Sequence, residues 1–90
     1  KQRPALIISN KKLNKSDDRL CCLITSNTPS EGILIENDCL ETGNLPFQSW
    51  VKPYMIFTIH HKIIKKSLCT VTKMFHEKAI IYLNGYLKID

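Results

Sequence analysis

The feature that most constrains the fold is a short apolar run near the start of the chain. Residues 20–24 read Leu-Cys-Cys-Leu-Ile, and the small polar residues Thr25, Ser26 and Asn27 follow directly. A run of this length is too short for a helix and is typical of a strand that is buried on both faces. The sequence therefore predicts a central buried strand whose last residues leave the core and can face a ligand.

Several other segments have strand-like composition and are separated by turn-forming residues. The predicted strands are residues 5–8, 33–35, 54–59 and 68–71, with a further extended segment at residues 49–52 that Pro53 ends. We expect the strand at 5–8 to pair antiparallel with the strand at 20–24. Residues 10–19, 27–32 and 37–44 are expected to be surface loops, and residues 60–66 to hold a single helical turn.

The pattern changes to a helical period after Thr72, which is a suitable N-cap residue. Large or apolar side chains then recur at helical spacing, namely Phe75, Ala79, Tyr82, Leu83 and Tyr86. Five or six short strands followed by one helix predict a mainly β protein with a C-terminal α-helix. The strongly curved sheet of such a chain is expected to form a half-closed barrel in a single domain, residues 1–90.

The composition of the chain indicates the charge of its partners and the redox state of its cysteines. The chain of 90 residues has a formal net charge of +5, which favours a polyanionic partner such as nucleic acid. Its four cysteines include no C-x-x-C pair and no histidine at metal-ligand spacing, so we expect reduced thiols, no structural zinc and no cofactor. No apolar run approaches the roughly 20 residues that cross a bilayer, and no signal peptide is evident, so we expect a cytoplasmic protein with no membrane partner.

Several short motifs occur along the chain in an order that is typical of a known protein family. The chain resembles the PemK/MazF family of bacterial toxins in Arg3-Pro-Ala-Leu-Ile-Ile-Ser9, Leu23-Ile-Thr-Ser-Asn27, Leu45-Pro46, Ser49-Trp-Val-Lys52, Ile56-Phe-Thr-Ile59 and Ile63-Ile-Lys-Lys66. The first two motifs are the most specific. The resemblance implies a small SH3-like β-barrel, a homodimer in the bacterial cytoplasm, and an endoribonuclease that cuts single-stranded mRNA at short sequences without a metal. It also implies neutralisation by a cognate antitoxin.

The resemblance further implies which residues form the site. The family uses the arginine of its Arg-Pro motif and the threonine that closes the next buried strand, which correspond to Arg3 and Thr25 as catalytic residues. Attack by the 2′-hydroxyl of the RNA needs alignment and stabilisation of charge on phosphorus, which an arginine and a hydroxyl can supply. The predicted RNA-binding residues are Ser26, Asn27, Ser30 and Lys52.

The chain also departs from the family pattern. The family's glycine-containing first strand has no counterpart ahead of Arg3. We expect either that the chain is cut there or that the first strand is supplied differently, and in both cases one edge of the barrel is open and part of the active site is missing. The segment from Lys52 to Met55 offers no carboxylate, and Phe57 stands where the family has an arginine, so no general base is assigned. These departures leave open a second function, a catalytically degraded toxin-like module that binds antitoxin or RNA without cleavage. A third, gyrase poisoning, is disfavoured by the Arg-Pro and Ile-Thr-Ser motifs.

Two aromatic residues and two histidines are weaker candidates for roles in RNA binding and catalysis. Trp50 and Phe47 can stack on an RNA base, but we expect them to pack in the core or in a dimer interface instead. The adjacent His60 and His61 can serve as acid and base because histidine titrates near neutral pH. We expect them to be surface residues.

Overall fold

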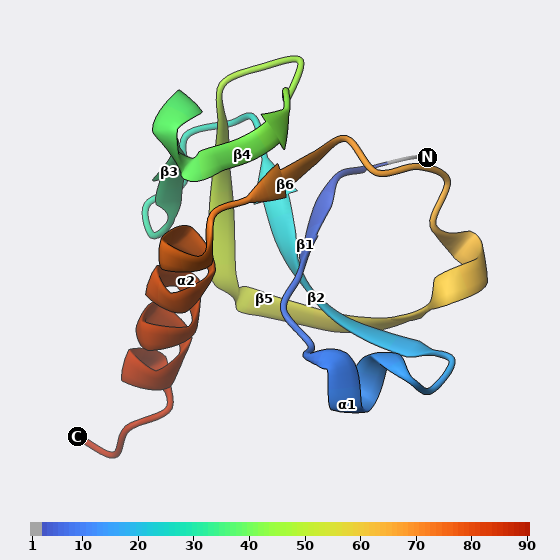
Figure 1. The fold of residues 1–90 in the computed structure, drawn as a ribbon. Helices are drawn as coiled ribbons and strands as arrows, with labels where there is room; N and C mark the ends of the chain where they lie inside the picture. Colours follow the sequence, from blue (N-terminus) through green and yellow to red (C-terminus); the bar gives the residue numbers. More distant parts are fainter. Residues whose placement is uncertain (1–2) are drawn as a thin grey trace.

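The computed structural model describes residues 3–90 and contains six strands, two α-helices and two short 3₁₀ turns (Figure 1). In chain order these are β1 (Ala5–Ile7), α1 (Lys11–Asn14), β2 (Asp18–Thr25), β3 (Ile33–Ile35), η1 (Asn37–Cys39), β4 (Leu40–Gly43), β5 (Ser49–His60), η2 (His61–Ile63), β6 (Cys69–Val71) and α2 (Lys73–Tyr86). The predicted class, mainly β with a C-terminal helix, is confirmed. Within residues 3–90 no helix combines the length and the apolarity that a membrane span requires.

The strands form a four-stranded antiparallel sheet in the order β1-β2-β5-β3 and a two-stranded sheet of β4 and β6. The predicted antiparallel pairing of β1 with β2 is confirmed, and β1 lies at one edge of its sheet. Figure 1 shows that β5 turns a corner in mid-length, so that its two halves border different parts of β2. This corner curls the sheet into the half-closed barrel that the sequence predicts.

The prediction that Pro53 ends a strand is wrong, because β5 continues through it from Ser49 to His60. The pairing with β2 shifts at this point: Cys22 lies opposite Ile56, whereas Leu23 lies opposite Lys52. The residues of β5 between these pairs stand outside the regular ladder, so the missing N–H of proline interrupts no ladder hydrogen bond there. Proline therefore marks the corner of β5 and does not end the strand.

Two predicted loops also contain regular structure. Residues 37–44 hold η1 and β4, because β4 pairs with β6, a partner nearly thirty residues later in the chain. Residues 10–19 hold α1, whose first turn is capped by the Asn10 side chain, and the first two residues of β2. The loop predicted at 27–32 and the helical turn predicted within 60–66 are confirmed.

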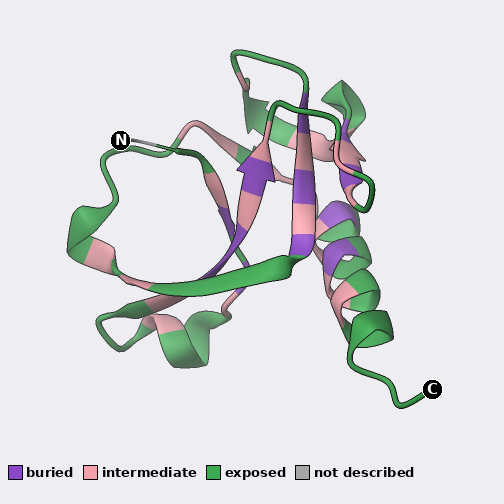
Figure 2. Ribbon diagram, turned by 180° about the vertical axis from the view of Figure 1, so that it is seen from behind, coloured by how far each residue is buried: buried purple, intermediate pink, exposed green. Residues whose placement is uncertain are grey.

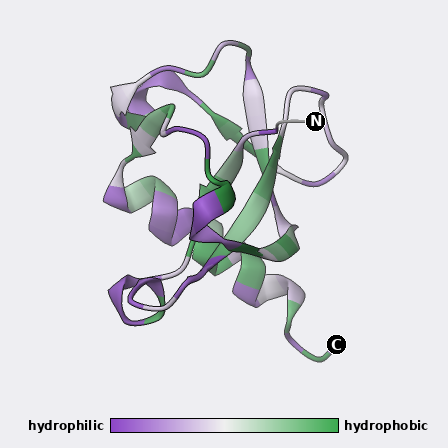
Figure 3. Cartoon of the chain, turned by 90° about the vertical axis from the view of Figure 1, so that its right-hand side faces the viewer, coloured by the Kyte–Doolittle hydropathy of each residue, from purple (hydrophilic) through white to green (hydrophobic). Residues whose placement is uncertain are grey.

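The core lies between the four-stranded sheet and α2 (Figure 2). Its buried members are Leu6, Ile8, Cys22, Ile24, Ile33, Ile35, Val51, Phe75 and Ala79. The helix begins as predicted, with the Thr72 hydroxyl accepting the N–H of Phe75 at 3.1 Å. Figure 3 shows hydrophobic segments along the central strands and hydrophilic segments in the peripheral connections. Burial of one helix face against the sheet thus supplies the core of this small domain.

Two of the four cysteines, Cys21 and Cys22, are small buried residues, as the sequence predicts. Cys21 and Cys22 are buried on opposite faces of β2, and Cys22 Sγ lies 3.5 Å from the backbone oxygen of Pro53, at the corner of β5. Burial, with a smaller contribution from the neighbouring Cys21, raises the pKa of Cys22 to about 11. Cys39 and Cys69 are half-buried, and all four thiols are free.

These environments predict a difference in thiol reactivity. Because thiolates are the reactive form, the buried thiols of Cys21 and Cys22 should resist iodoacetamide at pH 8 in the folded protein, whereas the partly accessible Cys39 is modified first. Peptide mass spectrometry before and after denaturation in urea measures this order. Modification of Cys22 as fast as that of Cys39 in the folded chain would contradict the packing of β2.

Candidate functional site

The register of the sheet leads the segment that carries Arg3 toward the end of β2, where Thr25 lies. In the antiparallel pair of β1 and β2, Ala5 lies opposite Leu23, and the backbone oxygen of Pro4 accepts the N–H of Ile24 at 3.4 Å. Arg3 precedes β1, and a continuation of this register by two residues would bring it opposite Thr25. Opposed residues of an antiparallel pair project their side chains from the same face, so in that continuation the guanidinium and the hydroxyl would share one face of the sheet edge.

The Thr25 side chain is oriented by its own loop. Its Oγ1 accepts the backbone N–H of Asn27 at 3.1 Å, which fixes the side chain at the end of β2. The contact from Oγ1 to the backbone oxygen of Asn27 is long, 3.5 Å. The hydroxyl proton can therefore turn from this weak partner to an anionic ligand without loss of the contact that orients the side chain.

Arg3 precedes β1 and is exposed. Among residues 3–90 the ion pairs join only Asp17 with two histidines, so no described carboxylate neutralises the guanidinium. A permanently charged, planar group with several donors is suited to bidentate contact with phosphate oxygens. Arg3 and Thr25 are therefore the candidates for a site with a positive charge and a hydroxyl donor.

The loop between β2 and β3 carries three predicted RNA-binding residues. Ser26, Asn27 and Ser30 are all exposed in it, next to Thr25. The far side of the loop is anchored, because Tyr86 of α2 donates a 2.9 Å hydrogen bond to a carboxylate oxygen of Glu31. The three residues are therefore presented on a loop that is held at both ends.

Lys52 lies on the same face as the site. It is opposite Leu23, two residues before Thr25 on β2, and its neighbour Val51 is fully buried in the core. Because side chains alternate along a strand, burial of Val51 places Lys52 on the opposite face, which Leu23 and Thr25 share. The structure thus places Lys52 on the same face of the sheet as Thr25.

The same alternation of side chains along β5 places Trp50 on the face that Thr25 shares. Trp50 is directly opposite Thr25, and Leu34 of β3 is directly opposite Trp50. Trp50 is half-buried and belongs neither to the core cluster nor to the side chains packed against it. Of the two expected positions, core or dimer interface, the core is therefore excluded, and the dimer interface stays a prediction. Phe47, with 71% of its surface exposed, is also outside the core. The sequence signal that could have indicated this position is the alternation Trp50-Val51-Lys52, in which Trp50 and Lys52 share one face of the strand and the buried Val51 takes the other.

A cleft lies beside this row of residues. It has a volume of about 390 Å³ and is lined by Leu34 and by side chains of η1 and the connection from β4 to β5, among them Asn37, Asn44 and Gln48. Its amide groups offer both hydrogen-bond donors and acceptors. The sequence contained no sign of this cleft, because it depends on the unpredicted β4.

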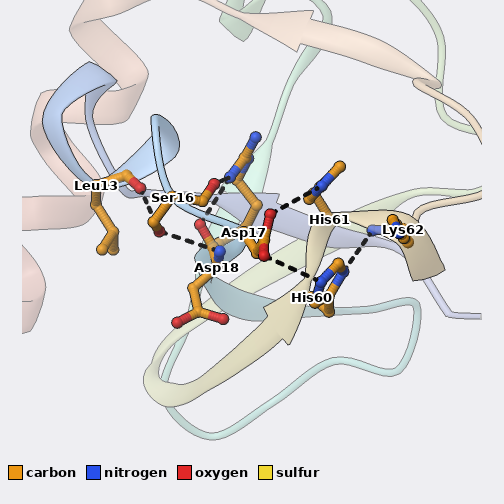
Figure 4. A network of polar contacts seen from close by, with 8 residues as sticks. Leu13, Ser16, Asp17, Asp18, His60, His61 and Lys62 are labelled. Carbon is orange, nitrogen blue, oxygen red and sulfur yellow. Dashed lines mark hydrogen bonds and ion pairs between the residues drawn. The ribbon is translucent and has the colours of Figure 1, made fainter.

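The two histidines lie far from the site. His60 is opposite Asp18 at the start of β2, whereas Thr25 is at its end, roughly 20 Å away for seven residues of strand. As Figure 4 shows, both histidines face Asp17, with Nε2 atoms 3.7 Å (His60) and 3.5 Å (His61) from its two carboxylate oxygens. They are surface residues, as predicted, and no acid–base role at Arg3 and Thr25 fits this position.

These three side chains have the composition of a metal site, with ligand atoms within 4.8 Å of one another. The Nδ1 of His60, however, accepts the backbone N–H of Lys62 at 3.1 Å, so the proton of the neutral ring is on the Nε2 that faces Asp17. A metal on this Nε2 would force a proton onto Nδ1, against the N–H of Lys62. The arrangement favours a polar contact that joins the end of β5 to the start of β2.

Comparison with known families agrees with this arrangement of motifs. A family model described as PemK-like, MazF-like toxin of type II toxin-antitoxin system matches residues 1–83. No curated protein sequence matches the chain. The match covers the sheet, the site and most of α2, and it confirms the resemblance that the sequence motifs indicate.

Proposed function

Because the chain belongs to the PemK-like, MazF-like toxin family of type II toxin–antitoxin systems, we propose that it is an endoribonuclease that cleaves single-stranded mRNA at specific short sequences. The observation that supports this proposal is the antiparallel register of β1 and β2, in which Ala5 lies opposite Leu23, so that the segment ahead of β1, which carries Arg3, leads toward the end of β2 at Thr25. Ser26, Asn27, Ser30 and Lys52 surround this pair and bind the RNA on either side of the scissile phosphate.

The proposed reaction is an attack by the RNA on itself. The 2′-oxygen forms a bond to the adjacent phosphorus, the bond from phosphorus to the 5′-oxygen breaks, and the products are a 2′,3′-cyclic phosphate and a 5′-hydroxyl. The proton of the 2′-hydroxyl passes to solvent and the leaving oxygen takes one from solvent. Arg3 and Thr25 donate hydrogen bonds to the phosphate oxygens, whose negative charge grows in the transition state. No metal ion takes part in this scheme.

A second candidate function is a toxin-like module that binds antitoxin or RNA without cleaving it. The observation that favours it is the composition of β5, which contains no carboxylate to act as a general base. In this case Arg3 and Lys52 would still hold the phosphate backbone. The two candidates differ in whether bound RNA is cut.

The proposal includes the partners of the family. The net charge of +5 suits a small acidic antitoxin, which would cover the basic face around Arg3 and Lys52 and thereby neutralise the toxin. We also propose a homodimer in the bacterial cytoplasm.

Incubation of the protein with a mixed-sequence single-stranded RNA and with DNA of the same sequence, both in EDTA, tests the proposal. We expect discrete RNA fragments and intact DNA, because DNA lacks the attacking 2′-hydroxyl. Intact RNA that is nevertheless bound, as measured by fluorescence anisotropy, would select the non-cleaving module. Cleavage of DNA, or neither binding nor cleavage of RNA, would overturn both candidates.

A further inference from the structure

We infer that Trp50 is a stacking platform for a nucleobase of the RNA held at Arg3 and Thr25. This inference rests on the proposed function and adds to it a residue that binds a base and not the phosphate. It is carried by the position of Trp50 in the sheet, by the direction of its side chain and by its partial exposure.

Trp50 occupies the same row across the sheet as the catalytic pair. The register places Thr25 opposite Trp50, and its continuation places Arg3 opposite Thr25. Neighbouring strands are about 4.8 Å apart, so the backbone at Trp50 is about 5 Å from that at Thr25 and about 10 Å from that at Arg3. A phosphate held between Arg3 and Thr25 therefore has the indole within reach of an attached base.

The indole projects from the face that carries the site. Val51 follows Trp50 and is fully buried in the core, so Trp50 and Lys52 project from the other face of β5. Thr25 is on that face, because Ile24 beside it belongs to the core. The largest aromatic side chain of the molecule is thus placed next to the hydroxyl donor with a cation two residues away.

The environment of Trp50 fits a binding role better than a packing role. The side chain is half-buried, which holds the ring, and it lies outside the core cluster, where apolar burial would otherwise explain a tryptophan. Proteins that recognise single-stranded RNA stack its unpaired bases on aromatic rings beside a positively charged backbone path. Trp50 with Arg3 and Lys52 has both parts of this arrangement.

The chain contains a single tryptophan, so its intrinsic fluorescence reports on Trp50 alone. We propose to titrate the wild-type protein in EDTA with a labelled, mixed-sequence 2′-O-methyl RNA, which has no free 2′-hydroxyl for attack, and to follow label anisotropy and tryptophan emission together. Stacking predicts quenching of the emission along the same binding curve as the anisotropy. An oligomer of the same length with abasic sites should bind more weakly and leave the emission unchanged.

Variants give a second readout on cleavable RNA. Trp50→Leu should weaken RNA binding about 10-fold and raise KM more than it lowers kcat, whereas Trp50→Phe should restore most of the affinity. Tyr82→Leu, which removes an exposed aromatic side chain from α2, is the matched control and should bind like the wild type. If Trp50→Leu does not fold, the titration of the wild-type protein still tests whether Trp50 stacks on a base.

The outcomes separate the two proposals. A rise in anisotropy without a change in tryptophan emission would overturn the stacking role and leave the proposed function standing. An absence of any anisotropy change at low salt would overturn RNA binding and the stacking role with it. Quenching that is equally strong with the abasic oligomer would also overturn stacking, because the emission would then respond to the backbone and not to a base.

Discussion

Replacement of Arg3 by alanine is expected to lower the rate of RNA cleavage at least 100-fold while the chain stays folded. Arg3 is exposed just ahead of β1, and in the proposed reaction its guanidinium neutralises charge that develops on the phosphate. Loss of one preorganised donor to a developing oxyanion typically costs about 10²–10³ in rate. Single-turnover cleavage of a fixed RNA, with circular dichroism of the same samples, measures both parts of the prediction.

Matched variants separate this role from a general loss of charge. Arg3→Lys keeps the charge but loses the planar fork of donors, so it should retain an intermediate rate. Lys12→Ala removes an exposed cation from α1, and His60→Gln changes a histidine that lies at the other end of β2 from Thr25. Both variants should therefore cleave RNA at the wild-type rate. Equal losses in Arg3→Ala and Lys12→Ala would show that charge alone, and not the position of Arg3, explains the effect.

Phe75→Ala is expected to have the largest effect on stability, a decrease of about 3–5 kcal/mol in the free energy of unfolding. Only 3% of the Phe75 surface is exposed, and this residue of the first turn of α2 belongs to the same core cluster as Val51 of β5. A cavity at this place removes apolar contacts that a small domain cannot replace. Urea unfolding followed by circular dichroism measures the change.

The residue before Phe75 provides the control. Met74 is on the outer face of α2 with 82% of its surface exposed, so Met74→Ala should change the free energy of unfolding by less than about 0.5 kcal/mol. If the two variants lose similar stability, the helix does not pack by the face that the structure shows.

The elements that could be predicted are those whose signals are local. The buried run at the centre of β2 is continuous in sequence, and the start of α2 is marked by a capping residue, Thr72, followed by apolar residues at helical spacing. The same is true of the antiparallel pairing of β1 and β2, which a short polar connection allows. Burial and capping at these places need no knowledge of distant residues.

The elements that were mispredicted depend on partners far away in the chain. Pro53 signals a strand end by its missing N–H, but the pairing of β5 with β2 shifts at that point and tolerates it. The segment of β4 contains Gly43 and polar residues and resembles a loop until β6 pairs with it. Tertiary pairing overrode the local composition in both cases.

The candidate site was predictable only in part, for the same reason. Arg3 and Thr25 were indicated by motifs, and Lys52 by its charge. The sequence left open whether Trp50 packs in the core or in a dimer interface, because a tryptophan in a strand carries no mark of the face that it occupies until the register of the strand is known. The burial of Val51 and the pairing of Trp50 with Thr25 supply that information.

The most direct test of the account is the chemical nature of the ends that the protein leaves on RNA. Fragments produced in EDTA are separated and their ends identified by mass spectrometry, with one 2′-deoxynucleotide placed at the mapped cleavage position as a second substrate. Attack by the RNA at Arg3 and Thr25 predicts 2′,3′-cyclic phosphate and 5′-hydroxyl ends and no cleavage at the deoxy position. Fragments with 5′-phosphate and 3′-hydroxyl ends, or cleavage that persists at the deoxy position, would contradict it.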